Sequence, residues 1–349
     1  MQLLFIRKLV YQVLVLNTKQ IGRMDTGKIY FAIPLVLFFV PKISQGAKIM
    51  KNDREKLDAE NYLKKPAVSN SRLSVHTVPT FNISFDRITL VGDLIPECEK
   101  QVSNFISIDS SISVLEALSS KFKVQHVLDD IYIEYDKFKG KSLQRKNMRI
   151  EFNPNNLDQN SMNWIKNNFL KFMRDIEFSR LDLAFDTEIN LADFFVMSDK
   201  ALKKTVFYGR DDKPETRYFG TRQSDRYIRI YNKKQEIKDN KDLEIAAENL
   251  WRIEFELKRE MTEKWEFCFD DMSFIKPDWK SIEKISERSM IYLLLNEEGE
   301  WGNINRKTKY KYKNILKDTS PIDLKNNMQE ELNLQREKLQ KELDFWLGE

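Results

Sequence analysis

The chain has 349 residues with a formal net charge of +4; 32% of them are charged and 12% are aromatic. This composition excludes a disordered chain, because it supplies enough apolar surface for a core. It also excludes a strong overall basic field, so any binding of nucleic acid must depend on local clusters of positive charge. The two cysteines, Cys98 and Cys268, lie far apart in the sequence. They fit a cytoplasmic protein and are expected to pack as small apolar residues.

The first 49 residues do not match the rest of the chain. The apolar run at residues 29–40 is too short to span a bilayer, which takes about 20 residues. It is compatible with a signal peptide that starts at Met24, with a membrane anchor, or with a true translation start at Met50. We favour the last, because nothing downstream looks secreted. Residues 1–49 are thus an atypical extension and residues 50–70 a polar lead-in, with no membrane partner expected.

From residue 71 onward the pattern predicts strands with helices inserted between them. We expect strands at residues 84–91, 131–135, 205–208 and 217–220, and helices at 111–122, 161–177, 193–204 and 232–249. After Pro277 the pattern becomes helical, at residues 280–296, 305–317 and 321–347. The chain is therefore predicted to be α+β, with a mixed or antiparallel central sheet and a helical C-terminal region.

Four further strands, at residues 148–153, 180–186, 225–231 and 252–258, alternate between apolar and polar residues. With a period of two, the apolar residues share one face and the polar residues the other. The polar rows are Arg149/Glu151/Asn153, Arg180/Asp182/Asp186, Tyr227/Arg229/Tyr231 and Arg252/Glu254/Glu256/Lys258. Carboxylates, arginines and tyrosines concentrated on one face are what metal-assisted chemistry on a phosphate requires.

Tyr231 is the candidate nucleophile on this face. A phenol with a reference pKa of about 10 needs nearby cations to become a phenolate at neutral pH. Arg229 on the same strand face, with Lys233 and Lys234 just after it, would supply them. The alternative is that a tyrosine on a strand only packs.

Four carboxylates, Asp182, Asp186, Glu254 and Glu256, are the candidate ligands for Mg²⁺ or Mn²⁺, because hard cations take oxygen ligands. The metal would act as a Lewis acid and as a template. Cross-strand ion pairing is the structural alternative for the same residues.

A basic segment at residues 303–317 contains no acid. Its cations are Arg306, Lys307, Lys309, Lys311, Lys313 and Lys317, interleaved with Tyr310 and Tyr312. Such a helix suits the phosphates of a DNA duplex, although a solvated face is the commoner meaning of a lysine run. The last helix carries apolar residues near heptad spacing. It would pair with a partner chain or dock on its own domain, and the pattern does not decide between these.

Residues 209–220 and 224–236, the latter containing Arg229-Ile230-Tyr231-Asn232-Lys233-Lys234, resemble the Rep_trans (replication initiation factor) family of rolling-circle plasmid replication initiators. Residues 180–186, 251–259 and 301–312 continue the resemblance, which runs from about Ser69 to the C-terminus. It implies a relaxase-like nicking and strand-transfer domain at residues 71–275, and an origin-recognition and dimerisation region at 276–349. The activity implied is that of a topoisomerase-like, metal-dependent DNA nickase.

The same resemblance implies that Tyr231 attacks a scissile phosphate, keeps the 5′ end as a phosphotyrosine and later religates the strand. It also implies a homodimer that binds an inverted-repeat origin and the nicked single strand, and that recruits a host helicase. The expected DNA contacts are Asn303, Asn305, Arg306, Lys307, Lys309 and Lys311. The chain has no pair of histidines separated by one residue, which excludes the histidine-pair type of relaxase. A conjugative relaxase of the same catalytic type and a non-enzymatic DNA-binding regulator remain alternatives.

Overall fold

The computed structural model describes residues 80–118, 120–127, 130–139, 145–210, 212–241 and 243–348. The interpretations of residues 1–49 and 50–70 lie outside these ranges. Within them, none of the helices combines the length and the apolar character that a membrane span requires.

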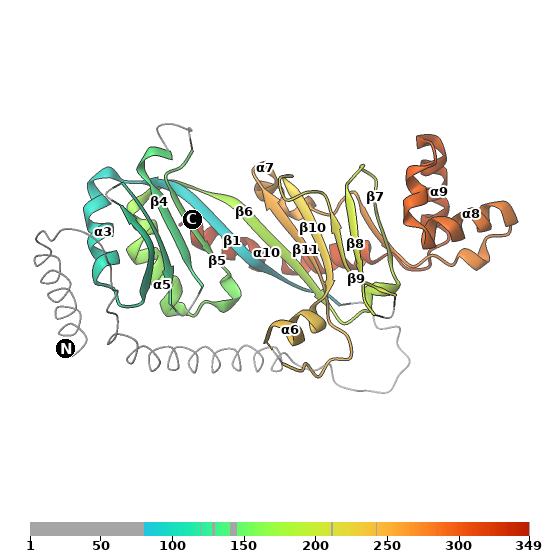
Figure 1. Ribbon diagram of the computed structural model, residues 1–349, viewed down its shortest axis with the longest axis horizontal. Helices are drawn as coiled ribbons and strands as arrows, with labels where there is room; N and C mark the ends of the chain where they lie inside the picture. The colour runs from blue at the N-terminus through green and yellow to red at the C-terminus, as the bar shows by residue number, and fades with distance from the viewer. Residues whose placement is uncertain are drawn as a thin grey trace, which may run out of the picture. The chain divides into compact units, whose positions relative to one another are not determined.

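The described residues form a large antiparallel sheet with helices around it (Figure 1). Its strand order is β2-β3-β4-β5-β1-β6-β11-β10-β9-β8, and each neighbouring pair is antiparallel. The strands are β1 (Asn82–Leu94), β2 (Ile112–Leu118), β3 (Lys121–His126), β4 (Tyr132–Asp136), β5 (Met148–Phe152), β6 (Met173–Thr187), β8 (Lys204–Tyr208), β9 (Pro214–Phe219), β10 (Arg226–Asn232) and β11 (Trp251–Lys258). A separate pair joins β7 (Phe195–Ser198) to β12 (Met272–Ile275). The predicted α+β class is confirmed.

The four alternating strands are confirmed as β5, the second half of β6, β10 and β11, and all four belong to this sheet. Leu181, Leu183 and Phe185 of β6 are fully buried on the apolar face. In β11 the residues opposite them belong to the same row, because Leu257, Phe255 and Ile253 pair with these three in register. The polar residues between them point to the other side, which we call the polar face: Arg180, Asp182 and Asp186 of β6, and Arg252, Glu254, Glu256 and Lys258 of β11.

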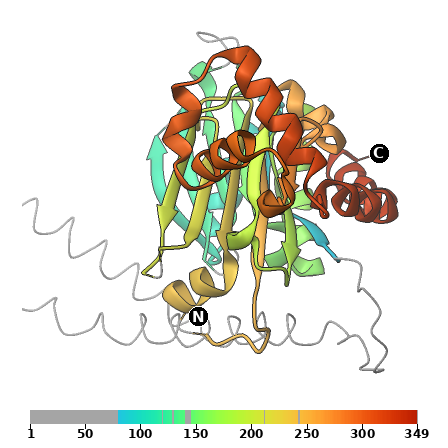
Figure 2. The ribbon, with the colours of Figure 1, turned by 90° about the vertical axis from the view of Figure 1, so that its right-hand side faces the viewer.

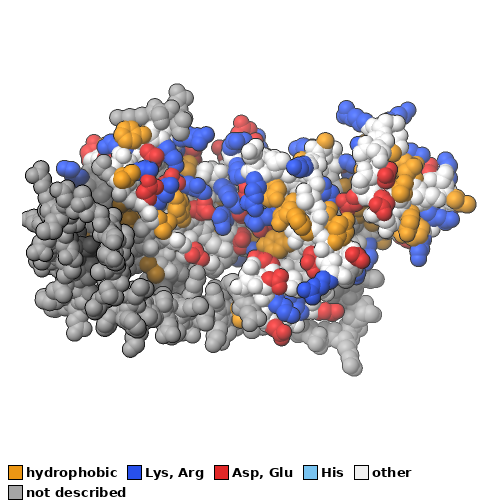
Figure 3. Space-filling view, in the orientation of Figure 1, with side chains coloured by type: hydrophobic (Ala, Val, Ile, Leu, Met, Phe, Trp, Pro, Cys, Tyr) orange, Lys and Arg blue, Asp and Glu red, His pale blue; other side chains and the backbone are white. Residues whose placement is uncertain are grey.

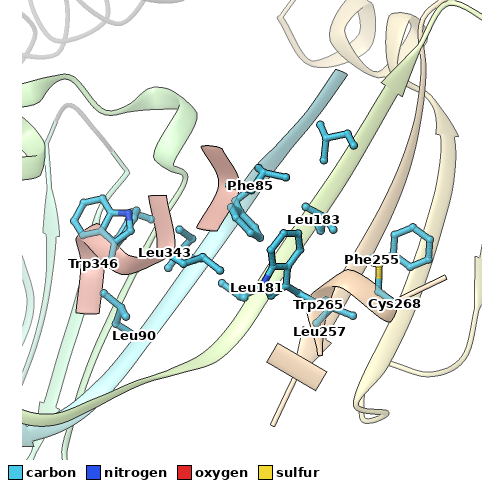
Figure 4. Close-up of a cluster of buried hydrophobic side chains, with 14 of the residues drawn as sticks. Phe85, Leu90, Leu181, Leu183, Phe255, Leu257, Trp265, Cys268, Leu343 and Trp346 are labelled. Atoms are coloured by element: carbon cyan, nitrogen blue, oxygen red, sulfur yellow. The ribbon is translucent and has the colours of Figure 1, made fainter. Parts of the chain in front are cut away.

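The helix α10 (Leu324–Leu347) covers the apolar face. Its apolar stripe is buried in the same core as the sheet: Leu324, Met328, Leu332, Leu339, Leu343 and Trp346. Trp346 lies 4.4 Å from Phe152, measured between ring centres, and Figure 4 shows it with Leu343 beside Leu90 and Phe85. Fully burying one such side chain contributes about 1.5–3 kcal/mol. Of the two interpretations of the last helix, the structure therefore shows docking on its own domain.

The other two C-terminal helices pack elsewhere. The helices α8 (Ile285–Asn296) and α9 (Arg306–Asp318) form a second, smaller core with β7 and β12. Its buried residues are Met197, Ile275, Ile282, Ile291, Leu294, Tyr312 and Leu316. Figure 2 shows the orange-red pair α8 and α9 apart from the dark red α10. Residues 276–349 are therefore two structural parts, one carrying the basic helix and one completing the main core.

Two of the predicted helices are wrong, and two others are too long. Residues 111–122 instead form β2 and the start of β3, where Phe122, Val124 and His126 are buried with a period of two. The predicted helix at 193–204 contains the strand β7, which pairs with β12. The helix predicted at 161–177 is α5 (Gln159–Asn168), and β6 begins at Met173. In these three segments, pairing with another strand overrides the local helical pattern.

The remaining helices are short. They are α3 (Glu99–Ile108), α6 (Lys233–Lys241) and α7 (Glu260–Glu263). The helix predicted at 232–249 is thus confirmed only in its first half. Cys98 and Cys268 are both free thiols, and Cys268 is fully buried in the main core, as expected for a small apolar residue.

Candidate functional site

Tyr231 lies where β10 ends and α6 begins, on the polar face. The Asn232 side chain accepts a hydrogen bond from the backbone N–H of Gln235 at 3.1 Å, and this cap starts the helix directly after the tyrosine. The half-buried Tyr231 lines a cavity of about 300 Å³ between the sheet and the helix. The other lining residues are Glu215, Thr216, Tyr218, Arg229, Asn232, Gln235, Glu236, Asp239 and Asn240.

The structure brings Tyr231, Arg229 and Glu254 together. The Tyr231 hydroxyl donates a hydrogen bond to Oε2 of Glu254 at 3.3 Å, and the other oxygen of the same carboxylate pairs with the Arg229 guanidinium. Arg229 and Glu254 are direct neighbours across the β10–β11 register. Glu254 is buried, whereas the Arg229 side chain is 26% exposed. A phenol, a carboxylate that can accept its proton and a reachable cation therefore meet at one point.

The Tyr231 phenol is protonated at neutral pH in this environment. Burial is the main cause that raises the pKa of Tyr231 above its usual value. Arg252 and Arg229 oppose this shift, whereas the carboxylates of Glu236 and Asp86 add to it. Proton removal is therefore a requirement of any attack by this oxygen.

The two lysines expected to support a phenolate have other partners. Lys233 forms an ion pair with Glu236 at 2.6 Å, and its ammonium lies 5.7 Å from the centre of the Tyr231 ring. The Lys234 ammonium donates to the backbone carbonyl of Ala247 at 2.8 Å and holds the segment after α6. The cation that most lowers the pKa of Tyr231 is Arg252, directly opposite it in the register. The sequence analysis placed Arg252 in the polar row without a role, because the pairing of β10 with β11 was unknown.

Three of the four candidate metal ligands lie together. Asp182 of β6 is directly opposite Glu256 of β11, and Glu254 lies two residues further along β11 on the same face. The Arg180 guanidinium binds both oxygens of Asp182, at 2.7 and 2.6 Å, and also reaches Glu256 at 2.8 Å. Arg229 lies 3.7 Å from Asp182. We call Asp182, Glu254, Glu256, Arg180 and Arg229 the Glu254 cluster.

The fourth candidate, Asp186, belongs to a different group. Both of its oxygens accept hydrogen bonds from Arg252, at 2.6 and 2.8 Å. The third nitrogen of that guanidinium donates to Asp86 at 2.6 Å. Burial would raise the pKa of Asp86, but Arg252 and Lys233 outweigh it and hold the pKa below its usual value. We call Asp86, Asp186 and Arg252 the Arg252 cluster.

Asp86 was missed by the sequence analysis. The register of β1 against β6 shifts between Phe85 and Arg87. Asp86 follows the buried Phe85 and so points to the polar face, and the bulge places Arg87 on the same face beside it. The only sequence feature that pointed to a role for Asp86 was that it is a carboxylate inside a predicted strand.

The chemistry of the Glu254 cluster suits a hard cation, although the cluster is not a preassembled metal site. Its carboxylate oxygens are the donors that Mg²⁺ and Mn²⁺ prefer. Burial raises the pKa of Asp182, and the buried Oε2 of Glu256 accepts no hydrogen bond, although it pairs with Arg180. Across the described ranges, no three ligand-type side chains are grouped closely enough to hold a metal. The arginines now neutralise the oxygens that a cation would need.

Several of the expected DNA contacts on and before α9 serve the fold. The side chain of Asn305 caps the helix by accepting from the N–H of Thr308 at 2.9 Å. Asn303 donates to Glu300 at 3.1 Å, and Lys311 pairs with Glu287 of α8 at 2.8 Å. Arg306 and Lys307 are exposed, and Lys309 is half-buried.

The basic segment is therefore less positive in space than in sequence. Glu287 comes from α8, and Lys317 pairs with Asp199, which follows β7. Lys313 donates to the backbone carbonyl of Ser198 at 2.5 Å. The outward-facing part of this helix is its N-terminal turn together with Tyr310, which is 69% exposed.

Comparison with known proteins agrees with the resemblance drawn from the sequence. Residues 87–173 match the family model described as the N-terminal part of replication initiation proteins, RepD-like. A replication initiation protein of Staphylococcus aureus is 52% identical over 294 residues, covering 84% of this chain and 94% of the relative. A second from the same organism is 49% identical over 300 residues, covering 85% and 95%. The chain belongs to the family of replication initiation proteins.

A structural neighbour is the rolling-circle replication initiator protein from Geobacillus stearothermophilus. It shares 13% sequence identity with this chain, covers 60% of it and 91% of its own length, and superimposes with a TM-score of 0.37.

Proposed function

We propose that this protein initiates rolling-circle replication of a plasmid by nicking one DNA strand at the origin with Tyr231. The observation that carries the proposal is the hydrogen bond from the Tyr231 hydroxyl to Glu254, beside Arg229 and at the edge of a cavity. Membership of the replication initiation family supports origin DNA as the substrate. The resemblance of residues 209–220 and 224–236 to the rolling-circle initiators supports the rolling-circle mode.

In the proposed reaction the Tyr231 oxygen attacks the scissile phosphorus while its proton passes to Glu254. The bond from phosphorus to the tyrosine oxygen forms, and the bond from phosphorus to the 3′ oxygen breaks. The 3′ oxygen takes up a proton and leaves as a hydroxyl, and the 5′ end stays on Tyr231 as a phosphotyrosine. Because burial raises the pKa of Tyr231, a positioned proton acceptor is needed at neutral pH. Reversal of the same steps would religate the strand.

Arg229 would stabilise the negative charge that develops on the phosphate oxygens. Its guanidinium is partly exposed and already lies beside the attacking oxygen's acceptor. A preorganised donor of this kind acts without reorganisation at the moment of reaction. Lys233 and Lys234 have a positioning role in this scheme, because their ammonium groups hold α6 and the segment that follows it.

We propose Asp182, Glu254 and Glu256 as the ligands of a Mg²⁺ or Mn²⁺ ion. When bound, the cation would supply Lewis acidity and help to neutralise the leaving oxygen. These three carboxylates lie on neighbouring strands on one face. Asp186 is left out of the set, because both of its oxygens are held by Arg252.

For the origin duplex we propose α9 as the contacting element, through the exposed Arg306 and Lys307 and the neighbouring Lys309. Asn303, Asn305 and Lys311 would support this surface through their contacts within the fold. Action as a homodimer in the cytoplasm, with recruitment of a host helicase, completes the proposal and is supported by the resemblance to the initiator family.

The test uses supercoiled plasmid DNA that carries the candidate origin. We expect open circles in Mg²⁺ that carry protein on their 5′ ends, detected as a gel shift that protease removes, and none in EDTA. Tyr231→Phe should abolish the covalent product and leave duplex binding intact, because only the attacking oxygen is lost. Tyr208→Phe, which removes the hydroxyl of an exposed tyrosine on β8, is the matched control. A phosphotyrosine formed by Tyr231→Phe would refute the nucleophile, and nicking in EDTA would refute the metal.

A further inference from the structure

We propose that Phe207 and Tyr218 form a platform on which bases of the single DNA strand at Tyr231 stack. This inference rests on the proposed function, because the strand to be held is the one that carries the scissile phosphate. It assigns a binding surface to strands β8 and β9, which carry none of the groups proposed to react, Tyr231, Glu254 and Arg229.

The platform is a row of three aromatic rings across the end of the sheet. Tyr218 of β9 stacks on Tyr227 of β10, with ring centres 5.7 Å apart and planes inclined by 16°. Phe207 of β8 meets Tyr218 edge-on at 5.7 Å and 80°. The Arg222 guanidinium lies 5.6 Å from the centre of the Tyr227 ring. The row thus runs from a buried tyrosine on β10 to an exposed phenylalanine on the edge strand.

The row is continuous with the nicking site. Tyr218 pairs with Arg229 in the β9–β10 register, and Thr216 pairs with Tyr231. Tyr218 also lines the cavity that Tyr231 borders. Neighbouring strands lie about 4.8 Å apart, so the platform begins one strand away from the reacting groups. A DNA strand with its phosphate at Arg229 has its next bases within reach of these rings.

The chemistry of this surface favours bases over phosphates or an apolar ligand. Phe207 is 55% exposed on the edge strand of a face that is otherwise polar. Figure 3 shows hydrophobic side chains gathered over β8–β10, next to Lys and Arg side chains over β1, β6 and β11. On the cavity wall opposite Arg229, Asp239 adds a carboxylate and Glu236 is paired with Lys233, so α6 offers a phosphate little positive charge. A single strand matches this division, with its backbone on the cations and its bases on the rings, because every base offers a π-face.

The test measures the affinity of the full-length protein for a labelled oligothymidylate of about 12 nucleotides by fluorescence anisotropy. Phe207→Ala should weaken binding about ten-fold, the effect of losing one base–aromatic stack, and Phe207→Trp should restore it. Tyr208→Ala is the matched control, because Tyr208 is 56% exposed and, as the next residue of the strand, points to the opposite face of the sheet. Its affinity should equal that of the wild type.

A second ligand separates the contribution of the bases to binding from that of the phosphates. On an abasic oligonucleotide of the same length, which keeps every phosphate, Phe207→Ala and wild type should bind equally. An unchanged affinity of Phe207→Ala for oligothymidylate, or an equal loss on the abasic strand, would overturn the platform. The measurement is repeated with Tyr231→Phe as the parent, in which no covalent product forms. If Phe207→Ala weakens binding in this parent while Tyr231→Phe still nicks DNA, the nucleophile assignment is wrong and the platform stands. If Phe207→Ala has no effect on binding, the platform is wrong whatever the nucleophile.

Discussion

The Glu254 cluster and the Arg252 cluster occupy the same face of the same strands, β6 and β11, yet they differ in what they leave available. In the Arg252 cluster the Arg252 side chain is 2% exposed, and its three guanidinium nitrogens donate to Asp86 or Asp186. In the Glu254 cluster the Arg229 side chain is 26% exposed, and the Tyr231 hydroxyl shares its carboxylate. The Arg252–Asp186 pair is thus closed, and only Asp86 at its rim is partly exposed, at 26%. The Glu254 cluster is open toward the cavity that Arg229 and Tyr231 line.

This difference separates structural from chemical roles among residues of the same type. A buried ion pair in which every donor and acceptor is matched has no group left for a substrate. Removing one partner leaves the other as an unpaired buried charge. A partly exposed pair can exchange its partner for a phosphate or a metal at lower cost. Asp186 and Asp182 lie only four residues apart on one strand face, but their partners place them in different classes.

The largest expected effect concerns the stability of the closed cluster. Arg252→Ala leaves Asp186 without its partner in a buried site, which should lower the free energy of unfolding by about 3–5 kcal/mol. Arg229→Ala should cost clearly less, because its guanidinium is partly exposed and Glu254 keeps the Tyr231 hydroxyl. Urea unfolding followed by circular dichroism measures both. Equal losses in the two variants would remove the distinction between a closed and an open cluster.

The next effect concerns metal binding. Glu256→Gln should weaken Mn²⁺ binding at least ten-fold, because a proposed ligand loses its charge. Asp186→Asn should leave it unchanged, since Arg252 already holds both oxygens. Isothermal titration calorimetry with Mn²⁺ and the apoprotein provides a readout independent of nicking. Weaker binding in Asp186→Asn, with unchanged binding in Glu256→Gln, would reverse the proposed ligand set.

The smallest expected effect comes from a third ion pair away from the polar face. Arg226 binds Asp271, which also accepts from Ser198 at 2.6 Å. Burial would raise the pKa of Asp271, but these hydrogen bonds lower it to about 2. Because the folded pKa lies below the unfolded value, the stabilisation is present above about pH 4 and is lost as the pH falls to about 2.

Asp271→Asn should therefore be less stable than the wild type by about 1 kcal/mol at pH 7, a figure that allows for solvent screening. The difference should shrink as the pH falls from 5 toward 2. Nicking should be unaffected, as expected for a closed pair. Denaturant unfolding at several pH values measures this, and a difference that grew in acid would contradict the assignment.

Much of the fold was predictable because it depends on local patterns. The strict alternation of residues 180–186 and 252–258 fixed which side chains share a face, and both strands are confirmed. The helices at the C-terminus are also confirmed, since their apolar periodicity is strong. The hairpin at β2 and β3 was mistaken for a helix, because a short apolar run fits both periods until a partner strand is known.

The candidate site was predictable only in part. Tyr231, Arg229 and the carboxylates of the polar face could be selected by alternation and by residue type. Their grouping could not, because it depends on the order and register of strands that are distant in the sequence. Arg252 reaches Asp86 across 166 residues, and Glu287 reaches Lys311 from another helix.

The sequence by itself determined the composition of the polar face, the position of Tyr231 on it and the membership of a replication initiation family. Tertiary structure alone decided which cation faces which carboxylate. It separated Asp186 from Asp182, turned Lys234 toward a backbone carbonyl and set an aromatic row beside Tyr231. The physical reason is that the face on which a side chain lies follows from the alternation of its own strand. Its charge environment follows from the neighbours that strand pairing places around it.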